Sequence, residues 1–180
     1  MRTWSKYLNS QKYSECQVVT ALNAYYYLTG KIYCEQNSQE YENLVNLCCA
    51  RNGAAISIEK VHKKLGLKII GYSTYLSTMT ETEWYKLEAL KKLIKGRHPK
   101  DLPKRIRRKI RLPIEIKVWH KITGYHSILI VDHCLKSETY RIANFRYETS
   151  TKGWMFAEDL YKFTTDMNEG WVFRLFGLEK

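Results

Sequence analysis

Hydrophobic residues change their spacing partway along the chain. Up to about residue 95 they mostly recur every three or four positions, which is typical of helices that pack through one face. From Pro113 onward they alternate with polar residues or form continuous apolar runs, which is typical of strands. Helices followed by strands favour an α+β fold over repeated βαβ units.

Helices are predicted in the first part of the chain. The first is indicated by a capping box, Ser14-x-x-Gln17, followed by apolar residues at helical spacing. It runs from about Glu15 to Leu28, and Gly30 ends it. Three further helices are predicted over about 39–50 after Ser38, over 58–65 after Ser57, and over 81–95 after a second capping box, Thr80-x-x-Glu83.

Strands are predicted mainly in the second part. They cover residues 67–73, 114–120, 124–134, 138–145 and 170–176, with a helical turn from Glu158. The three strands between 114 and 145 follow one another through short connections, which predicts an antiparallel meander. The expected architecture is therefore an N-terminal helical half packed on a C-terminal antiparallel β-sheet.

A length of 180 residues with 44% hydrophobic content indicates one folded domain over residues 1–180. We expect a helical half over about 1–96, a basic linker over about 97–111 and a β half over about 112–180. Five cysteines, an odd number without a C-x-x-C pair, argue against a disulfide framework and predict a cytoplasmic location. The polar N-terminus lacks the apolar stretch of a signal peptide, and the longest aliphatic run, Ile128 to Val131, is too short to cross a bilayer, so no membrane contact is expected.

Most of the positive charge lies in one segment. The chain has 30 Lys and Arg against 18 Asp and Glu, a net charge of +12. Lys91–Arg111 contains eleven of the basic residues and a single Asp, which leaves a net charge of only +2 for the rest of the chain. Such a segment is either a solvated face or a contact for a polyanion, nucleic acid or an acidic protein. No aromatic residue lies between Lys95 and Arg111, so a platform that stacks single-stranded bases is not indicated.

Cys16 is the principal candidate for chemistry because it falls at the start of the first predicted helix. The unbonded N–H groups of a helix N-terminus and the helix dipole stabilise a negative charge there. A cysteine becomes a nucleophile when its thiolate is stabilised. The other cysteines are expected to be packing residues; they are Cys34, Cys48, Cys49 and Cys134.

A cysteine hydrolase also needs an imidazole base, a group that orients the imidazole, and donors for the oxyanion. His126 begins the most apolar strand and Asn144 closes the next one. In a hairpin that turns around residues 136–138, both are equally far from residue 135, so we expect them at one end of the sheet, with the Asn144 amide accepting from the imidazole N–H. Gln11, five residues before Cys16, is expected to add a side-chain N–H to the backbone N–H of the cysteine.

Other histidines compete with His126. His62 lies on a Lys-rich predicted helix and is expected to be solvated. His120 and His133 lie on or near strands and are the rivals for the role of base. His133 falls at the far end of its strand from Asn144, which favours His126.

The order of these residues matches a family of enzymes. The chain resembles papain-like cysteine peptidases, and most closely the bacteriocin-processing peptidases that cleave leader peptides after a double glycine, in the segments SQKYSECQVVTALNA, SIEKVHKKLGLKI, LPIEIKVW, GYHSILIVDH and YRIANF. The resemblance covers about residues 9–163. It implies a papain-like fold with Cys16 as nucleophile, His126 as base and Asn144 as orienting residue. It also implies that Gln11 is an oxyanion donor, that the substrate is a polypeptide cleaved after small residues, and that no metal or cofactor takes part.

The chain departs from that family at several positions. Gln17 follows the cysteine where the family usually has Gly, and the spacing from Gln11 to the cysteine is one residue shorter. Asn144 stands where Asp is more usual. Two alternatives therefore stay open: a catalytically inactive papain-fold protein that docks on nucleic acid or an acidic partner through Lys91–Arg111, and an enzyme that transfers an acyl group to an acceptor other than water. A small basic peptidase of this kind would suit a virus, a phage or a mobile element.

Overall fold

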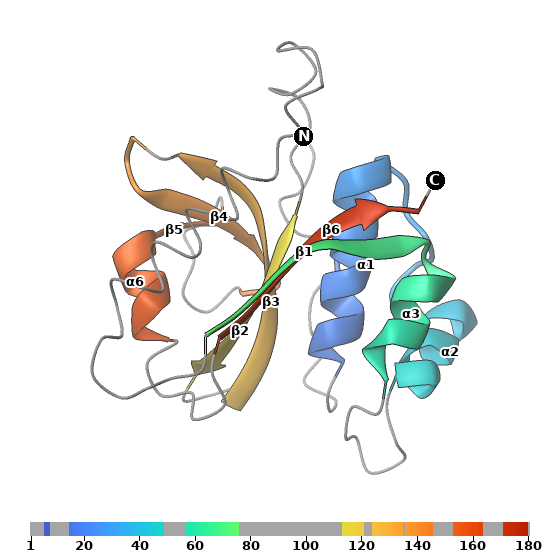
Figure 1. Ribbon diagram of the computed structural model, residues 1–180. Coiled ribbons are helices and arrows are strands. Elements are labelled where there is room, and N and C mark those ends of the chain that lie inside the picture. The colour runs from blue at the N-terminus through green and yellow to red at the C-terminus, as the bar shows by residue number, and fades with distance from the viewer. Residues whose placement is uncertain are drawn as a thin grey trace.

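The computed structural model of the protein describes residues 6–7, 15–48, 57–75, 113–120, 124–134, 136–145, 153–163 and 171–179. It consists of helices packed on an antiparallel sheet (Figure 1), so the predicted α+β class is confirmed. In chain order the elements are α1 (Cys16–Thr29), α2 (Gln39–Cys48), α3 (Ile58–Lys64), β1 (Leu67–Tyr75), β2 (Ile114–His120), β3 (Gly124–Cys134), β4 (Thr139–Ala143), β5 (Trp154–Phe156), α6 (Ala157–Lys162) and β6 (Trp171–Leu178). Every helix and strand predicted within the described residues is present, and β5 is an additional strand.

Local signals decide where the helices begin and end. Gly30 ends α1 with a φ of 73°, in the left-handed region that favours glycine. Ser38 precedes α2, and its Oγ accepts from the Tyr41 N–H at 3.2 Å, so this predicted cap is confirmed. The cap residue of α1 is Glu15 rather than the predicted Ser14, which lies outside the described residues.

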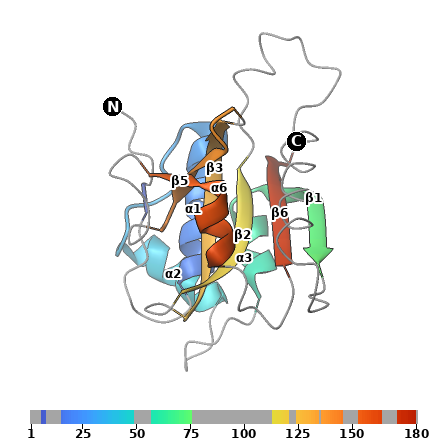
Figure 2. The same cartoon turned by 90° about the vertical axis from the view of Figure 1, so that its left-hand side faces the viewer.

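The sheet has the strand order β1-β6-β2-β3-β4-β5, and every neighbouring pair is antiparallel. Strands β2 to β5 are neighbours in chain order, so the predicted meander is confirmed. Strand β1, which comes from the half expected to be mainly helical, forms the opposite edge by pairing with β6. One face of the sheet packs against α1, α2 and α3, and the other against α6, which lies in front of the sheet in Figure 2 with α1 behind it.

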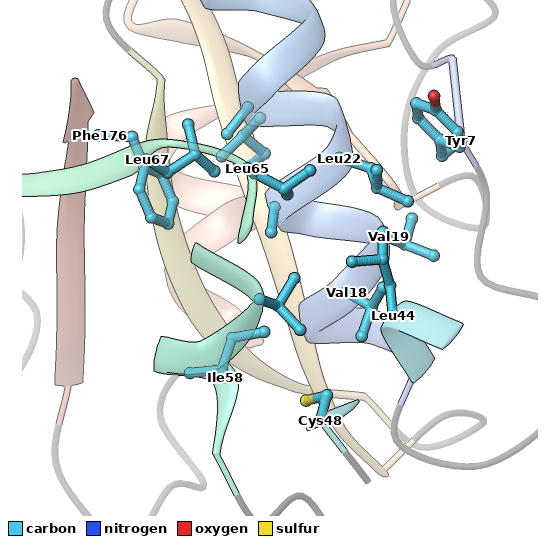
Figure 3. Close-up of a cluster of buried hydrophobic side chains, with 14 of the residues drawn as sticks. Tyr7, Val18, Val19, Leu22, Leu44, Cys48, Ile58, Leu65, Leu67 and Phe176 are labelled. Atoms are coloured by element: carbon cyan, nitrogen blue, oxygen red, sulfur yellow. The ribbon is translucent and has the colours of Figure 1, made fainter. Parts of the chain in front are cut away.

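Two hydrophobic cores lie on the two faces, because successive residues of a strand point to opposite sides. On β3, Leu129 and Val131 belong to the cluster with α1, α2 and α3, part of which Figure 3 shows. Ile128 and Ile130 belong to the cluster with α6. All four are at most 1% exposed, and burying each stabilises the fold by roughly 1.5–3 kcal/mol. The continuous apolar run of this strand therefore reflects a sheet covered on both faces.

Two predicted features lie outside the described residues: the helix over about 81–95 and the basic segment Lys91–Arg111. Within the part of the chain that is described, no helix is long and apolar enough to cross a membrane.

Candidate active site

Cys16 is the first residue of α1, and its side chain is partly exposed. In the first turn of the helix the Val19 N–H donates to the Glu15 carbonyl at 2.8 Å. The helix dipole makes the start of α1 electropositive. Cys16 therefore lies at the end of α1 where a negative charge is favoured.

Side-chain contacts fix the start of α1 to its surroundings. Glu15 is 5% exposed, and its Oε2 accepts a hydrogen bond from the Tyr41 hydroxyl on α2 at 3.0 Å. Burial, together with the Glu15 charge, raises the pKa of Tyr41, so this phenol keeps its proton and remains a donor. Asn23 Oδ1 accepts from the backbone N–H groups of Lys6 and Tyr7 at 2.9 and 3.2 Å. The chain on the N-terminal side of α1 is thus attached to the helix, and the helix start to α2.

His126 lies near the start of β3 and is 5% exposed. Its Nε2 lies 2.6 Å from the main-chain oxygen of Asn144. Because a carbonyl oxygen can only accept, Nε2 carries the proton of this bond, and Nδ1 holds the lone pair of the neutral ring. Phe145 flanks the imidazole, with 6.0 Å between the ring centroids. The imidazole is therefore held in one tautomer, with Nδ1 as its basic atom.

The bond predicted for the Asn144 amide is made by its main-chain carbonyl. The residue follows β4 with a φ of 67°, a left-handed conformation that asparagine adopts more readily than most residues. Its Nδ2 donates to the Ser127 carbonyl at 3.1 Å. A carboxylate cannot donate this bond, which gives a physical reason for Asn rather than Asp at this position.

The register of β3 and β4 also differs from the prediction. Leu129 lies opposite Ala143, so the pairing is displaced by two positions from the one that would place His126 opposite Asn144. The displacement begins at the turn, where Cys134 lies opposite Thr139, and a bulge after Ile130 reduces it by one position. The two residues nevertheless lie at the same end of the hairpin, as predicted, because their 2.6 Å contact joins them. The sequence therefore predicted which end of the sheet holds both residues, but it did not predict the register between β3 and β4.

The carbonyl of Ser127 connects α1 to this end of β3. It accepts from Thr20 Oγ1 at 2.9 Å as well as from Asn144 Nδ2. Thr20 follows Cys16 by one helical turn, about 6 Å along the axis, and Ser127 follows His126 by one residue, about 3.3 Å along the strand. Helix α1 and strand β3 rise in the same direction in Figure 1, so the start of α1 lies toward the same end of the sheet as the start of β3.

The thiol and the imidazole belong to different faces of the sheet. Alternation along β3 places His126 on the side of Ile128 and α6, where Phe145 also lies, whereas α1 covers the other side. Within the described residues, pairing with β4 ends at Leu129, and only β2 flanks the start of β3.

A buried ion pair between Glu115 and Arg174 contacts the side chain of Ser127. Glu115 on β2 is 2% exposed; its carboxylate accepts from Ser127 Oγ at 2.6 Å and from Arg174 Nη1 at 3.1 Å. The alternation of apolar and polar residues in IEIKV predicts that this glutamate faces solvent, but α1, α2 and α3 cover that face of the sheet. The burial could have been suspected from the sequence, because this acidic residue stands within a strand of β-branched apolar residues.

His62 on α3 is buried, so the prediction that it is solvated is wrong. Its ring packs edge-on against Phe176, with 5.0 Å between centroids, and its Nε2 has no hydrogen-bond partner among the described residues. Burial lowers the pKa of His62; Arg174 acts in the same direction, and Glu115 opposes it. The helical spacing contained the signal, because this histidine lies four residues after Ile58 on the apolar face of the helix.

The remaining cysteines differ in their environments. Cys48 is buried and Cys34 partly buried, as expected for packing residues, but Cys134 is exposed, so the packing prediction is wrong there. Burial raises the pKa of the Cys34 thiol, whereas a hydrogen bond from Ser137 lowers the pKa of Cys134. Residues 34 and 134 are thus natural comparators for the reactivity of Cys16.

Gln11, the predicted oxyanion donor, lies outside the described residues. Across the ranges that are described, no group of three or more His, Cys, Asp or Glu side chains is arranged to hold a metal ion. No known protein family and no curated protein matches the chain. The functional interpretation therefore depends on the arrangement of Cys16, His126, Asn144 and Ser127.

Proposed function

We propose that the protein is a cysteine peptidase of papain-like fold in which Cys16 is the nucleophile and His126 the base. The observation that carries this proposal is the hydrogen bond from Thr20 to the Ser127 carbonyl, because it joins α1, one turn after Cys16, to the residue that follows the histidine. The fixed tautomer of His126 supports it further, since Nδ1 is left as the basic atom. The resemblance to leader-cleaving peptidases implies the same chemistry.

The reaction proceeds in two halves. The thiol proton of Cys16 passes to Nδ1 of His126, and the thiolate attacks the peptide carbonyl carbon, whose oxygen takes the negative charge. When this intermediate collapses, the C–N bond breaks, the amine leaves with the proton from Nδ1, and a thioester remains. Water then attacks the thioester, giving a proton to Nδ1, and the carboxylic acid leaves as that proton returns to sulfur.

Two groups assist the transfer of charge. The Asn144 carbonyl accepts from Nε2 throughout, so it holds the ring in place and stabilises the imidazolium that forms in each half. The N–H groups at the start of α1, together with Gln11, bind the oxyanion. A preformed set of donors aimed at the oxyanion lowers the barrier because the donors need no reorganisation during the reaction.

The proposed substrate is a polypeptide, cleaved after small residues, in a precursor or partner protein. The Lys91–Arg111 segment is the proposed contact for acidic regions of such a partner or for nucleic acid. Affinity for a polyanion should then fall steeply with salt concentration.

The first test is alkylation of the native protein with iodoacetamide at about pH 6, well below the ordinary cysteine pKa of about 8.5. Mass spectrometry of the digested product reports each cysteine separately. Cys16 should react faster than Cys34 and faster than Cys134, whose lowered pKa makes it the stringent comparator. His126→Gln should remove the advantage of Cys16 while leaving the other two rates unchanged.

The second test is hydrolysis of a peptide library made by digesting a whole proteome. The wild-type protein should generate new termini, and Cys16→Ser should generate none. If Cys16 shows no advantage in alkylation and the library stays intact, the peptidase proposal is refuted and the catalytically inactive alternative is favoured. If thioester formation is seen without hydrolysis, the acyl-transfer alternative is favoured, and amine acceptors should then be converted to amides.

A further inference from the structure

We propose that Thr20 is a positioning residue for the Cys16–His126 pair, acting through the carbonyl of Ser127. This inference rests on the proposed function, because it concerns the geometry of the same thiol and imidazole. It assigns a role to a residue outside the four that the resemblance implies.

The contact of Thr20 is unusual for a threonine within a helix. A helical threonine hydroxyl commonly bonds to the carbonyl four residues earlier in its own helix. Thr29 does this at the other end of α1, where its Oγ1 donates to the Tyr25 carbonyl at 2.8 Å. Thr20 is fully buried, and its hydroxyl instead reaches a strand 107 residues away in sequence, at 2.9 Å. The bond therefore joins two elements rather than stabilising one.

The acceptor of this bond is itself held in place. Ser127 is 2% exposed, and its Oγ donates to the buried carboxylate of Glu115, which also binds Arg174. The Ser127 carbonyl accepts from Asn144, the residue that holds His126. Thr20 thus attaches α1 to the carbonyl of the residue that follows His126, and that carbonyl also accepts from Asn144.

The distance along α1 makes this attachment relevant to the thiol. Cys16 lies one turn before Thr20, so a change in the docking of this turn moves the sulfur relative to the imidazole. A misplacement of about 1 Å between reacting groups can reduce a rate by about 100-fold. Loss of the hydroxyl should therefore weaken the coupling between thiol and imidazole more than it weakens the fold.

The test compares three variants of the full chain. Thr20→Val removes the hydroxyl, Thr20→Ser keeps it, and Thr29→Val removes a hydroxyl from the same helix away from Cys16. The readout is the pH profile of the Cys16 alkylation rate by iodoacetamide, together with the urea midpoint of unfolding. Thr20→Val should slow alkylation at about pH 6 by roughly tenfold. The pH at which the alkylation rate reaches half of its maximum should rise toward the ordinary cysteine pKa of about 8.5. Thr20→Ser and Thr29→Val should keep the wild-type profile.

The outcomes separate this proposal from the proposed function. If Cys16 of the wild type is alkylated only near the ordinary cysteine pKa, it is not an activated thiol, and the peptidase proposal fails. If Cys16 is alkylated at acidic pH in the wild type and equally fast in Thr20→Val, the peptidase proposal stands and the positioning role is overturned. A Thr20→Ser profile as displaced as that of Thr20→Val would also overturn it, because the hydroxyl would not be the cause. If Thr20→Val does not fold, Thr20→Ala provides the same comparison.

Discussion

The buried ion pair of Glu115 and Arg174 should contribute strongly to stability, and Glu115→Ala tests this. The carboxylate is 2% exposed, and the Arg174 side chain is 14% exposed, so both charges lie mostly outside solvent. At a separation of 3.1 Å and an effective dielectric of about 20, their gross attraction is about 5 kcal/mol. Much of this is offset by the cost of removing both charges from water.

Removing one partner is different from removing both. Glu115→Ala leaves the Arg174 charge and the Ser127 hydroxyl without their acceptor, so we expect the free energy of unfolding to fall by about 3–5 kcal/mol. Glu115→Gln keeps one oxygen for the serine and loses the charge and the acceptor for Arg174, so its cost should be smaller than that of Glu115→Ala, about 1–3 kcal/mol. The double variant Glu115→Leu with Arg174→Met leaves no buried charge and should cost less than Glu115→Ala alone.

The assay is equilibrium urea unfolding at neutral pH, monitored by circular dichroism. All variants carry Cys16→Ser, so that proteolysis cannot affect the signal. A cost below about 1 kcal/mol for Glu115→Ala would show that the carboxylate is hydrated or displaced when the protein is in solution. A double variant less stable than Glu115→Ala would show that packing, rather than an unpaired charge, dominates the effect.

Two further predictions concern stability. Burial lowers the pKa of His62, so the unfolded chain binds a proton near pH 6.5 that the folded chain does not; this contribution to stability is complete above about pH 6.5 and is lost as the pH falls below that value. His62→Gln should therefore flatten the decline in urea midpoint between about pH 7.5 and 5.5, and parallel curves would contradict this. Tyr41→Phe should cost about 1.5–3 kcal/mol because the Tyr41 hydroxyl donates to the buried Glu15 carboxylate. Tyr33→Phe is the control, since its hydroxyl makes a longer bond of 3.4 Å to the more exposed Glu40; equal costs would refute the argument.

Features that depend on neighbouring residues could be predicted from the sequence. Helical spacing and the glycine at position 30 placed α1, and Ser38 marked the start of α2, because periodicity and capping act over a single turn. The strands of the meander followed from alternation and short connections for the same reason. Cys16 at a helix start, with His126 and Asn144 at one end of a hairpin, was likewise visible in the sequence.

Other features needed the tertiary structure. The burial of His62 and Glu115 depends on which elements cover each face of the sheet, and polar residues do not reveal this by their spacing. The hairpin turns between Cys134 and Thr139, which sets a register other than the predicted one, and Asn144 binds the imidazole through its carbonyl and uses its amide elsewhere.

The sequence by itself determined the α+β class, the approximate positions of the described helices and of every described strand except β5, and the candidate thiol and imidazole. The tertiary structure decided how the elements that carry these residues are joined, above all through the bond between Thr20 and Ser127, which are 107 residues apart. The physical reason is that hydrophobic periodicity and capping are local, whereas strand order, register and the covering of a face arise from contacts between distant segments.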